Sequence, residues 1–552
     1  MPSTIRTAVA AVRRVVASPD MRRAALAWML AWAAEWAWLV ALFVFAFATG
    51  GLPTVGLVGL IRTLPAALLA PALSSLTDRL PRHRLLLALH AGRAALLAAA
   101  ALMVVADGPA PLVYAIAALD GLLAVLHRPT HMALLPALAR SPEDLVAANA
   151  GSSTVEAVGI LVGPALGGVL VAVGIPALTF AMPAVLLAGA ALSVAGIAPA
   201  QRLRQTEGRR GIWTTLLGGV GTLVRHRQAG LMVALFGTQT LVRGVLSVLI
   251  VVAAIDMLGL GEQGVGYLNA AIGAGGLMGA FFAMMLVTQA RMAPWVLVGL
   301  VAWGAPIALM GLLPVPAVAF AALAAVGVGN AVLDVAGFSL LQRIVPNEVR
   351  GRVFGVLEAL VMLTVGLGAI IGPPLVAALD VRGALVATGL VLPILALAAA
   401  RTVLAADRLA VVPERELALL RAVPMFRVLP LTVLEQIAGD LVPVTFDRGA
   451  TVMHQGDVAD RFYVIAGGEL EVRVDDRVVR CMRAGESFGE VALLRDVRRT
   501  ASVVAVTEIE AFALGRESFL AAVTGDRQSM SAAEAVVGER LAADPALDHP
   551  PD

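Results

Sequence analysis

Residues 159–168 read GILVGPALGG, and a shorter version of this stretch, GAIIGPPL, returns at residues 368–375. In each copy a proline precedes the Gly-Pro pair by a similar interval, 27 positions before Gly163 and 26 positions before Gly372. Small residues in apolar runs let membrane helices approach closely, and a proline inside such a run kinks the helix. The repetition predicts that the chain contains two similar halves.

The composition indicates that both halves lie in a membrane. Of the 552 residues, 59% are hydrophobic and only 14% are charged, whereas about 25% of the residues in a typical soluble domain are charged. The net charge of +2 argues against a nucleic-acid partner. With one cysteine, Cys481, the chain cannot form an intrachain disulfide or a cysteine-rich metal site.

Apolar runs of about 20 residues predict twelve transmembrane helices in two pseudo-symmetric sets of six. The first set is expected at 24–48, 55–76, 84–106, 110–134, 150–173 and 176–198, and the second at 228–253, 264–287, 293–313, 316–340, 355–378 and 383–405. A duplicated six-helix layout is typical of transporters, with the substrate site between the halves near the membrane midplane.

The links between the expected helices alternate in charge. Arginines concentrate in alternate links, at 78–84, 139–144, 199–227 and 346–352, whereas the opposite links, such as 48–54, hold almost none. Because positively charged links stay on the cytoplasmic side, both termini are predicted to be cytoplasmic. We expect the protein to lie in the inner membrane of a bacterium.

The chain changes character after residue 405. Short β-type runs separated by glycine and aspartate predict a small β-barrel or jelly roll with flanking helices. The expected parts are a cytoplasmic amphipathic segment (1–23), a first six-helix half (24–198), a cytoplasmic loop (199–227), a second half (228–405), a helical linker (406–424) and the β domain (425–545).

Residues 488–501, FGEVALLRDVRRTA, contain the groups expected of a phosphate-binding turn, which we call the cradle. A helix that starts at a glycine leaves backbone amides free, and its dipole favours an anion. Arg499 follows Glu490 by nine residues, and its rigid fork suits phosphate oxygens. Glu490 can accept a hydrogen bond from a sugar hydroxyl. Together these groups predict a site for a cyclic ribose phosphate.

This stretch resembles the cyclic nucleotide-binding domain family, and the resemblance extends over about 420–540. It implies that Glu490 and the Gly489 amide bind the ribose 2′-hydroxyl, and that Arg499 and nearby amides bind the phosphate. Thr500 does not distinguish an adenine from a guanine base. We expect cAMP as the ligand, and cGMP stays an alternative. The family usually has proline where this chain has Arg498. The implied site comprises Phe488, Gly489, Glu490, Val491, Ala492, Leu493, Arg499, Thr500 and Ala501. The alternative is a degenerate barrel that binds no nucleotide and serves only a structural, packing role.

Two further stretches resemble the major facilitator superfamily. In SSLTDRLPRHRLLL (74–87), Asp78, Arg79 and Arg82 match a loop that latches the two halves at the cytoplasmic face. The alternative is an ordinary arginine-bearing loop. The stretch at 159–168 matches the motif of the fifth helix, associated with exporters and antiporters, through Gly163, Pro164, Gly167 and Gly168. Residues 128–150 resemble the branch that contains siderophore and macrolide exporters.

Charged residues inside the expected helices point to a transport pathway, because each costs at least a few kcal/mol at the bilayer centre. Glu35 and Arg243 hold nearly equivalent positions in the two halves, so we expect an ion pair across the pseudo-twofold axis. A proton or substrate role for Glu35 and a static ion pair both stay open. Asp120 and Asp334 are further candidates, with Arg62 and Arg93 as candidate partners of Asp120.

The sequence therefore predicts a secondary transporter, an exporter of a small organic molecule, that intracellular cyclic nucleotide regulates. A proton is a candidate coupling ion. No catalytic triad, metal cluster or phosphate-binding loop for ATP is visible, so we expect neither an enzyme nor a metal protein. The alternatives are a lysophospholipid carrier with the same regulation, and a membrane receptor for cyclic nucleotide that no longer transports.

Overall fold

The computed structural model describes residues 17–139, 142–197, 221, 223, 226–286, 291–345, 347–409, 414–429, 431–524 and 527–543. The chain forms two compact units, Met1–Ala410 and Val411–Asp552, so the division falls close to the expected boundary after residue 405. Much of the expected N-terminal segment, the loop at 199–227 and part of the linker at 406–424 lie outside the described residues.

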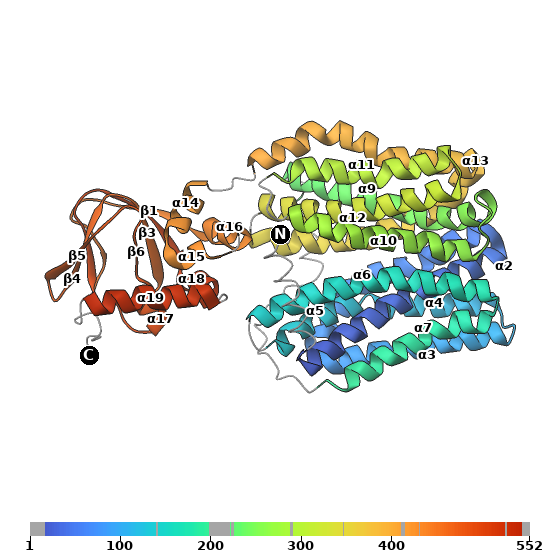
Figure 1. Ribbon diagram of the computed structural model, residues 1–552, viewed down its shortest axis with the longest axis horizontal. Coiled ribbons are helices and arrows are strands. Elements are labelled where there is room, and N and C mark those ends of the chain that lie inside the picture. The colour runs from blue at the N-terminus through green and yellow to red at the C-terminus, as the bar shows by residue number, and fades with distance from the viewer. Residues whose placement is uncertain are drawn as a thin grey trace. The chain divides into compact units, whose positions relative to one another are not determined.

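The first unit is a bundle of long helices (Figure 1). Its first half contains α2 (Pro19–Arg79), α3 (Arg82–Val105), α4 (Ala110–Ala124), α5 (His127–Leu138), α6 (Pro142–Val173) and α7 (Pro176–Ala195). Its second half contains α9 (Arg227–Val252), a π-helical turn (Ala253–Met257), α10 (Gln263–Leu286), α11 (Ala293–Leu312), α12 (Pro316–Ile344) and α13 (Asn347–Leu409).

Ten helices within the described residues are long and apolar enough to cross a membrane. Two of them, Pro19–Leu69 and Arg352–Asp407, have 51 and 56 residues, and each contains a break. The first break is at Gly51, which has a φ of +66°, and the second is at Asp380, whose carboxylate accepts a 2.8 Å hydrogen bond from the Gly383 amide. Each break falls between two expected helices, but the count of twelve stays a prediction.

The glycines of the 159–168 stretch let α6 pack closely on two neighbours. A methyl group at Gly163 would lie 2.5 Å from the carbonyl oxygen of Ala33 in α2. One at Gly168 would lie 2.9 Å from the carbonyl oxygen of Gln263 in α10, which belongs to the second half. Both distances are too short for a carbon atom. These small residues therefore bring a helix of the first half against one of the second.

The second unit is an antiparallel jelly roll, as expected. Its strands form two four-stranded sheets, with orders β1-β8-β3-β6 and β2-β7-β4-β5. The strands are β1 (Val442–Phe446), β2 (Thr451–Met453), β3 (Arg461–Gly467), β4 (Glu469–Val474), β5 (Arg477–Arg483), β6 (Ser487–Phe488), β7 (Ser502–Ala505) and β8 (Ile509–Gly515). Residues far apart in the chain thereby meet on neighbouring strands.

Helices flank the strands of this second unit. They are α14 (Glu414–Ala422), α15 (Pro424–Arg427), α16 (Leu431–Asp440), α17 (Glu490–Arg495), α18 (Arg516–Thr524) and α19 (Arg527–Ala543). Three fully buried aromatic rings join them to the sheet: Phe462 of β3 stacks on Phe519 of α18 at 4.7 Å and meets Phe426 of α15 at 5.6 Å. This core holds the turn between β6 and α17 in place.

Candidate functional site

The expected cradle is the turn from β6 into α17. Phe488 pairs with Tyr463 of β3, and the two rings stack at 5.0 Å. The next residue, Gly489, caps the helix with a φ of +94°, a conformation that other residues rarely adopt. A methyl group there would lie 2.8 Å from Nη1 of Arg499 and 3.0 Å from the carbonyl oxygen of Arg461. The turn therefore requires glycine for both its backbone angle and its space.

Arg499 is buried in the cradle with only modest compensation for its charge. Its side chain is 3% exposed. It donates to the carbonyl oxygens of Gly489 at 3.0 Å and Arg461 at 2.6 Å, and to a carboxylate oxygen of Asp460 at 3.4 Å. The Asp460 carboxylate is 67% exposed, so it offsets little of the cost of burial. Burial lowers the pKa of Arg499 and Asp460 partly opposes this. A bound anion would stabilise this guanidinium.

The carboxylate of Glu490 is fully buried, and only one of its two oxygens has a hydrogen-bond partner among the described residues. Its Oε1 accepts a hydrogen bond from Nη1 of Arg540 at 2.5 Å. Its Oε2 is buried with no hydrogen-bond partner among the described residues. Burial raises the pKa of Glu490, and the charge of Arg540 offsets part of that rise. Because a bare buried oxygen costs free energy, a hydroxyl donor would fit here.

In the structure Glu490 and Arg499 have different partners, as befits the separate roles expected for them, the ribose hydroxyl for Glu490 and the phosphate for Arg499. Each influences the pKa of the other through its charge, but they are not hydrogen-bonded: Arg499 faces Asp460, and Glu490 faces Arg540. Arg540 lies near the end of α19 and also donates to the Ser487 carbonyl oxygen at 2.5 Å. Sequence reasoning missed it, because its place in the chain has no fixed spacing from the motif.

The remaining predicted residues of the cradle support it by packing. Val491, Ala492 and Leu493 are buried in α17, with exposed fractions between 1% and 8%. Ala492 and Leu493 join the core that contains Phe462. Thr500 and Ala501, which follow Arg499, are buried as well. These side chains fix the position of the turn. They do not distinguish an adenine from a guanine base in a bound nucleotide.

Together, the long apolar helices and the jelly roll with its arginine-bearing turn define a multi-pass membrane protein that also has a small β domain. Residues 24–357, more than half of the chain, match the family model of the Major Facilitator Superfamily. Residues 443–526 match the model described as "Cyclic nucleotide-binding domain". The chain belongs to the Major Facilitator Superfamily and is fused to a cyclic nucleotide-binding domain.

The relatives found by sequence each match a short part of this chain. A cAMP-dependent protein kinase regulatory subunit of Colletotrichum orbiculare is 35% identical over 102 residues, 18% of this chain and 26% of that protein. The subunit of Blumeria graminis is 40% identical over 86 residues, 15% of this chain and 22% of that protein. This chain thus spans about a quarter of the length of these curated relatives.

Parts of two solved structures are similar to part of this chain. The regulatory domain of Toxoplasma gondii PKA in complex with cAMP is 29% identical and has a TM-score of 0.20, covering 20% of this chain and 44% of that one. The sensor domain of the transcriptional regulator DNR from Pseudomonas aeruginosa is 23% identical and has a TM-score of 0.21, covering 23% and 92%.

A second charged site lies inside the first half of the helical unit. Glu35 of α2 binds Arg62 of α2 and Arg93 of α3. Nε of Arg93 donates to Asp120 of α4 at 2.7 Å, and Nη2 of Arg62 lies 3.6 Å from the same carboxylate. Asp120 and Arg93 are 0% and 1% exposed. We call these four residues the charge network. Two acids and two arginines leave it formally neutral, as a low-dielectric site demands.

The predicted partners of Asp120 are therefore correct, but the predicted Glu35–Arg243 pair is wrong. The carboxylate of Glu35 is occupied by arginines of its own half. Arg243 of α9 instead places its guanidinium over the ring of Trp36 in α2, 6.0 Å from the centroid. It still joins the halves, but through a cation–π contact. Equivalence of position in a duplication does not dictate contact.

Asp334 belongs to a network of polar side chains in the second half. It accepts a 2.8 Å hydrogen bond from the amide of Asn330, whose oxygen accepts from Trp303 at 3.0 Å and Gln239 at 3.4 Å. Asp334 also acts on Arg243 through its charge. The sequence signalled Asp334 as an acid in a helix. Asn330, Trp303 and Gln239 were missed because they are uncharged, and the sequence search relied on charged residues inside helices.

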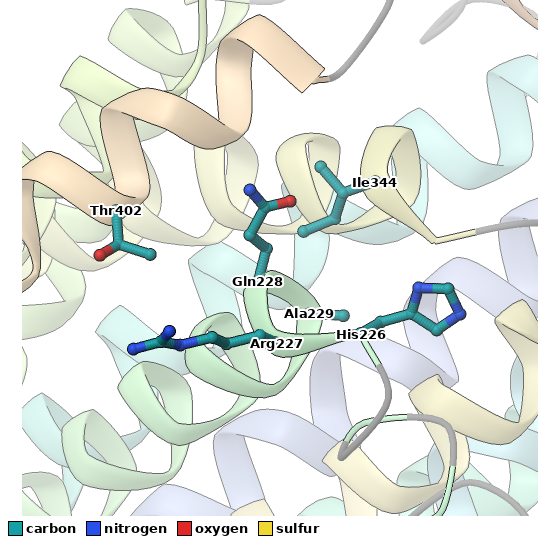
Figure 2. Close-up of a pocket in the computed structure, with 6 residues that line it drawn as sticks. All are labelled: His226, Arg227, Gln228, Ala229, Ile344 and Thr402. Carbon is teal, nitrogen blue, oxygen red and sulfur yellow. The ribbon is translucent and has the colours of Figure 1, made fainter.

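The predicted latch stays a prediction. The side chains of Asp78 and Arg79 lie outside the described residues, and Arg82 is half-buried at the start of α3. A cavity of about 470 Å³ lies near the ends of helices α9, α12 and α13 of the second half. Figure 2 shows the residues that line it. The cavity is lined by His226, Arg227, Gln228, Ala229, Ile344 and Thr402. Its described lining residues include no acid and come from the second half, so they do not match the expectation for a substrate site between the halves.

Proposed function

We propose that the chain is an exporter of small organic molecules in the inner membrane of a bacterium, and that intracellular cyclic nucleotide regulates it. The carrying observation is the bare, buried Oε2 of Glu490 beside the glycine cradle of Arg499. The names of the relatives favour cAMP over cGMP. The cytoplasmic side expected for the C-terminus is where such a nucleotide would be available.

The residues of the cradle fit the chemistry of the ligand. A cyclic nucleotide supplies an anionic phosphate and a ribose hydroxyl. Arg499 would hold the phosphate, since its buried guanidinium has only carbonyl oxygens and one long contact to Asp460. Oε2 of Glu490 would accept the hydroxyl. Gly489, which lacks a side chain, leaves the space that both groups need.

The arrangement also suggests how binding is transmitted. Glu490 holds Arg540, which lies near the end of α19, so a ligand on Oε2 acts on the carboxylate that anchors this helix. Near the other end of α19, the hydroxyl of Ser529 donates to the carbonyl oxygen of Met425 in α15 at 2.6 Å. In the chain α15 follows α14, which leads back to α13 of the transporter. A change at Glu490 can thus reach the membrane helices along the backbone.

Such regulation needs only a modest free energy. A ligand shifts the equilibrium between inward-facing and outward-facing states only if it binds the two states with different affinity. Coupling of about 1–3 kcal/mol changes the balance by about 5- to 150-fold. The transport chemistry would use the charged groups of the helical unit, and we propose no enzymatic step.

Transport in proteoliposomes tests the proposal. We expect efflux of one member of a panel of fluorescent cationic dyes and siderophore-like chelators to change when cAMP is present on the side of the C-terminus. The Arg499→Ala variant should transport at the rate of the ligand-free protein and ignore cAMP. Arg477→Ala, an exposed arginine of the β4–β5 hairpin, is the matched control. Equal transport by the wild type with and without nucleotide would contradict regulation.

The same preparation separates the alternatives. A lysophospholipid carrier would move a fluorescent lysophospholipid between leaflets and leave the soluble compounds in place. A receptor without transport would move none of the compounds, and Glu35→Gln would leave its cAMP response intact. For an exporter we expect Glu35→Gln to slow efflux, whereas cAMP binding by that variant should be unchanged.

A further inference from the structure

Three histidines gather in the first half of the helical unit, next to the charge network. They are His90 of α3 and His127 and His131 of α5, and their exposed fractions are 1%, 6% and 0%. The rings of His90 and His127 lie 5.0 Å apart, and those of His127 and His131 lie 6.5 Å apart. Nearly half of the seven histidines of the chain thus occupy one buried site, the histidine cluster.

The ring nitrogens of this cluster are poorly satisfied. Both nitrogens of His90, Nε2 of His127 and Nδ1 of His131 are buried without a hydrogen-bond partner in the described part of the chain. Nε2 of His131 lies 3.2 Å from the hydroxyl of Ser152 in α6. Leaving buried nitrogens bare costs free energy that phenyl rings of similar size would avoid. Packing alone therefore does not account for three imidazoles here.

Trp28 of α2 covers the cluster. Its ring stacks on His131 at 4.0 Å with an angle of 18° and lies 4.5 Å from the ring of His127. An indole can stabilise a protonated imidazole through a cation–π contact. Trp28 is itself fully buried, so the indole and the three imidazoles form one continuous aromatic group.

The cluster lies between the expected cytoplasmic face and the charge network. His90 is eight residues from the start of α3 and Arg93 is eleven, which places them about 12 and 16 Å along the helix. Among the described residues, the charged and titratable groups around the cluster are Arg93 and through it Asp120 and Glu35, Arg128 on α5, and Glu156 on α6, which pairs with Arg128 at 3.5 Å. Helix α7, which packs on α3, contains no charged residue.

We propose that His90, His127 and His131 form a proton-binding site that exchanges protons with the cytoplasm and acts on the charge network through Arg93. A proton adds to a bare ring nitrogen and makes an imidazolium beside Arg93. This adds a positive charge next to the neutral set of Glu35, Asp120, Arg62 and Arg93, and weakens the hold of Arg93 on its carboxylates. The buried arrangement favours neutral rings, so opening toward water favours proton uptake.

A divalent metal is the other occupant that three histidines suggest. Within the described residues, however, no group of histidine, cysteine and acidic side chains is arranged to hold a metal ion. Arg93 would also repel a divalent cation. The proton is thus the occupant that this site favours.

The stacked Trp28 provides a direct test that needs no substrate. An imidazolium quenches the fluorescence of an indole on which it stacks, so we expect the emission of the full-length protein in lipid nanodiscs to fall as the pH is lowered from 8.5 to 4.5. The fall should be absent in Trp28→Phe and strongly reduced in His131→Gln. Trp303→Phe and His454→Gln, an exposed histidine of the second unit, are the matched controls and should keep it.

Coupling to the charge network is tested in the same assay. Removing the negative charge in Glu35→Gln leaves Arg93 less compensated, so the midpoint of the fluorescence change should move down by about one pH unit. Asp256→Asn, which removes an exposed acid of the second half, should not move it. The proposal is overturned if no change depends on Trp28, if His131→Gln keeps the full change, if the change requires added Zn²⁺, or if Glu35→Gln leaves the midpoint in place.

Discussion

Two buried glutamates, Glu35 in the helical unit and Glu490 in the jelly roll, are each bound to arginine but differ in how completely they are satisfied. Both oxygens of Glu35 are bonded, one to Arg62 and the other to Arg93. Only one oxygen of Glu490 is bonded, to Arg540, and the other is bare. The first is part of a complete network, whereas the second leaves room for a donor from outside the chain.

The difference follows from the cost of an unpaired charge in each place. At the centre of a bilayer such a charge costs at least a few kcal/mol, so the helical unit balances two acids with two arginines. In the second unit the other oxygen of the same carboxylate is bound by Arg540, and the bare oxygen can be satisfied by a ligand. A network in which every charge is paired, as around Glu35, can stabilise the fold and couple helices. A site with an unpaired oxygen, as at Glu490, can bind a ligand.

The largest expected effect is the loss of a member of the charge network. Arg93→Ala should lower the free energy of unfolding by about 3–5 kcal/mol, because Asp120 and Glu35 stay buried without their main partner. Thermal unfolding of the detergent-solubilised protein measures this. Arg84→Ala, an exposed arginine of the same helix, should change the melting temperature little. Similar melting temperatures for both variants would show that the network contributes nothing to stability.

The next effect concerns the cradle. Arg499→Ala should weaken cAMP binding by about 100-fold or more, because a buried charge-assisted contact to the phosphate is lost. Isothermal titration calorimetry of the full-length protein checks this, with Arg477→Ala as the control that should bind like the wild type. A change below about threefold would mean that the cradle does not hold the phosphate.

A smaller effect is expected for the carboxylate. Glu490→Gln keeps an oxygen that can accept the ribose hydroxyl but removes the negative charge, so we expect cAMP to bind about tenfold more weakly. The same calorimetry measures it. The substitution should weaken the binding of a 2′-deoxy analogue of cAMP less than it weakens the binding of cAMP. If Glu490→Gln weakens the binding of both ligands equally, the hydroxyl does not contact Glu490.

The smallest effect is on the pH dependence of stability. Burial raises the pKa of Glu490, so the folded protein binds this proton more tightly than the unfolded chain does. The stabilisation is complete below the ordinary pKa of 4.5 and is lost as the pH rises through the raised value. Calorimetric melting of the wild type should show this loss, and Glu490→Gln should not. An identical pH profile for both proteins would contradict the assignment.

Local motifs predicted much of this protein. The stretch at 488–501 specified the glycine turn, the helix after it and the two charged residues, because their positions depend on a few neighbouring backbone angles. The apolar runs and arginine-bearing links likewise predicted the long helices, and the breaks at Gly51 and Asp380 fall where links between helices were expected. Spacing along the chain failed where the partners come from distant segments, as with Arg540 or the pairing of Glu35.

The sequence by itself determined the division into an apolar, duplicated part and a polar β domain, since hydrophobicity and turn residues act over short stretches. It also determined that Glu490 and Arg499 flank one short helix. Only the tertiary structure decided that Glu35 is bound by arginines of its own half, that Glu490 keeps one oxygen bare, and that Trp28 packs on two of the three clustered histidines. These contacts depend on which helix faces pack together, and packing is settled by the whole fold.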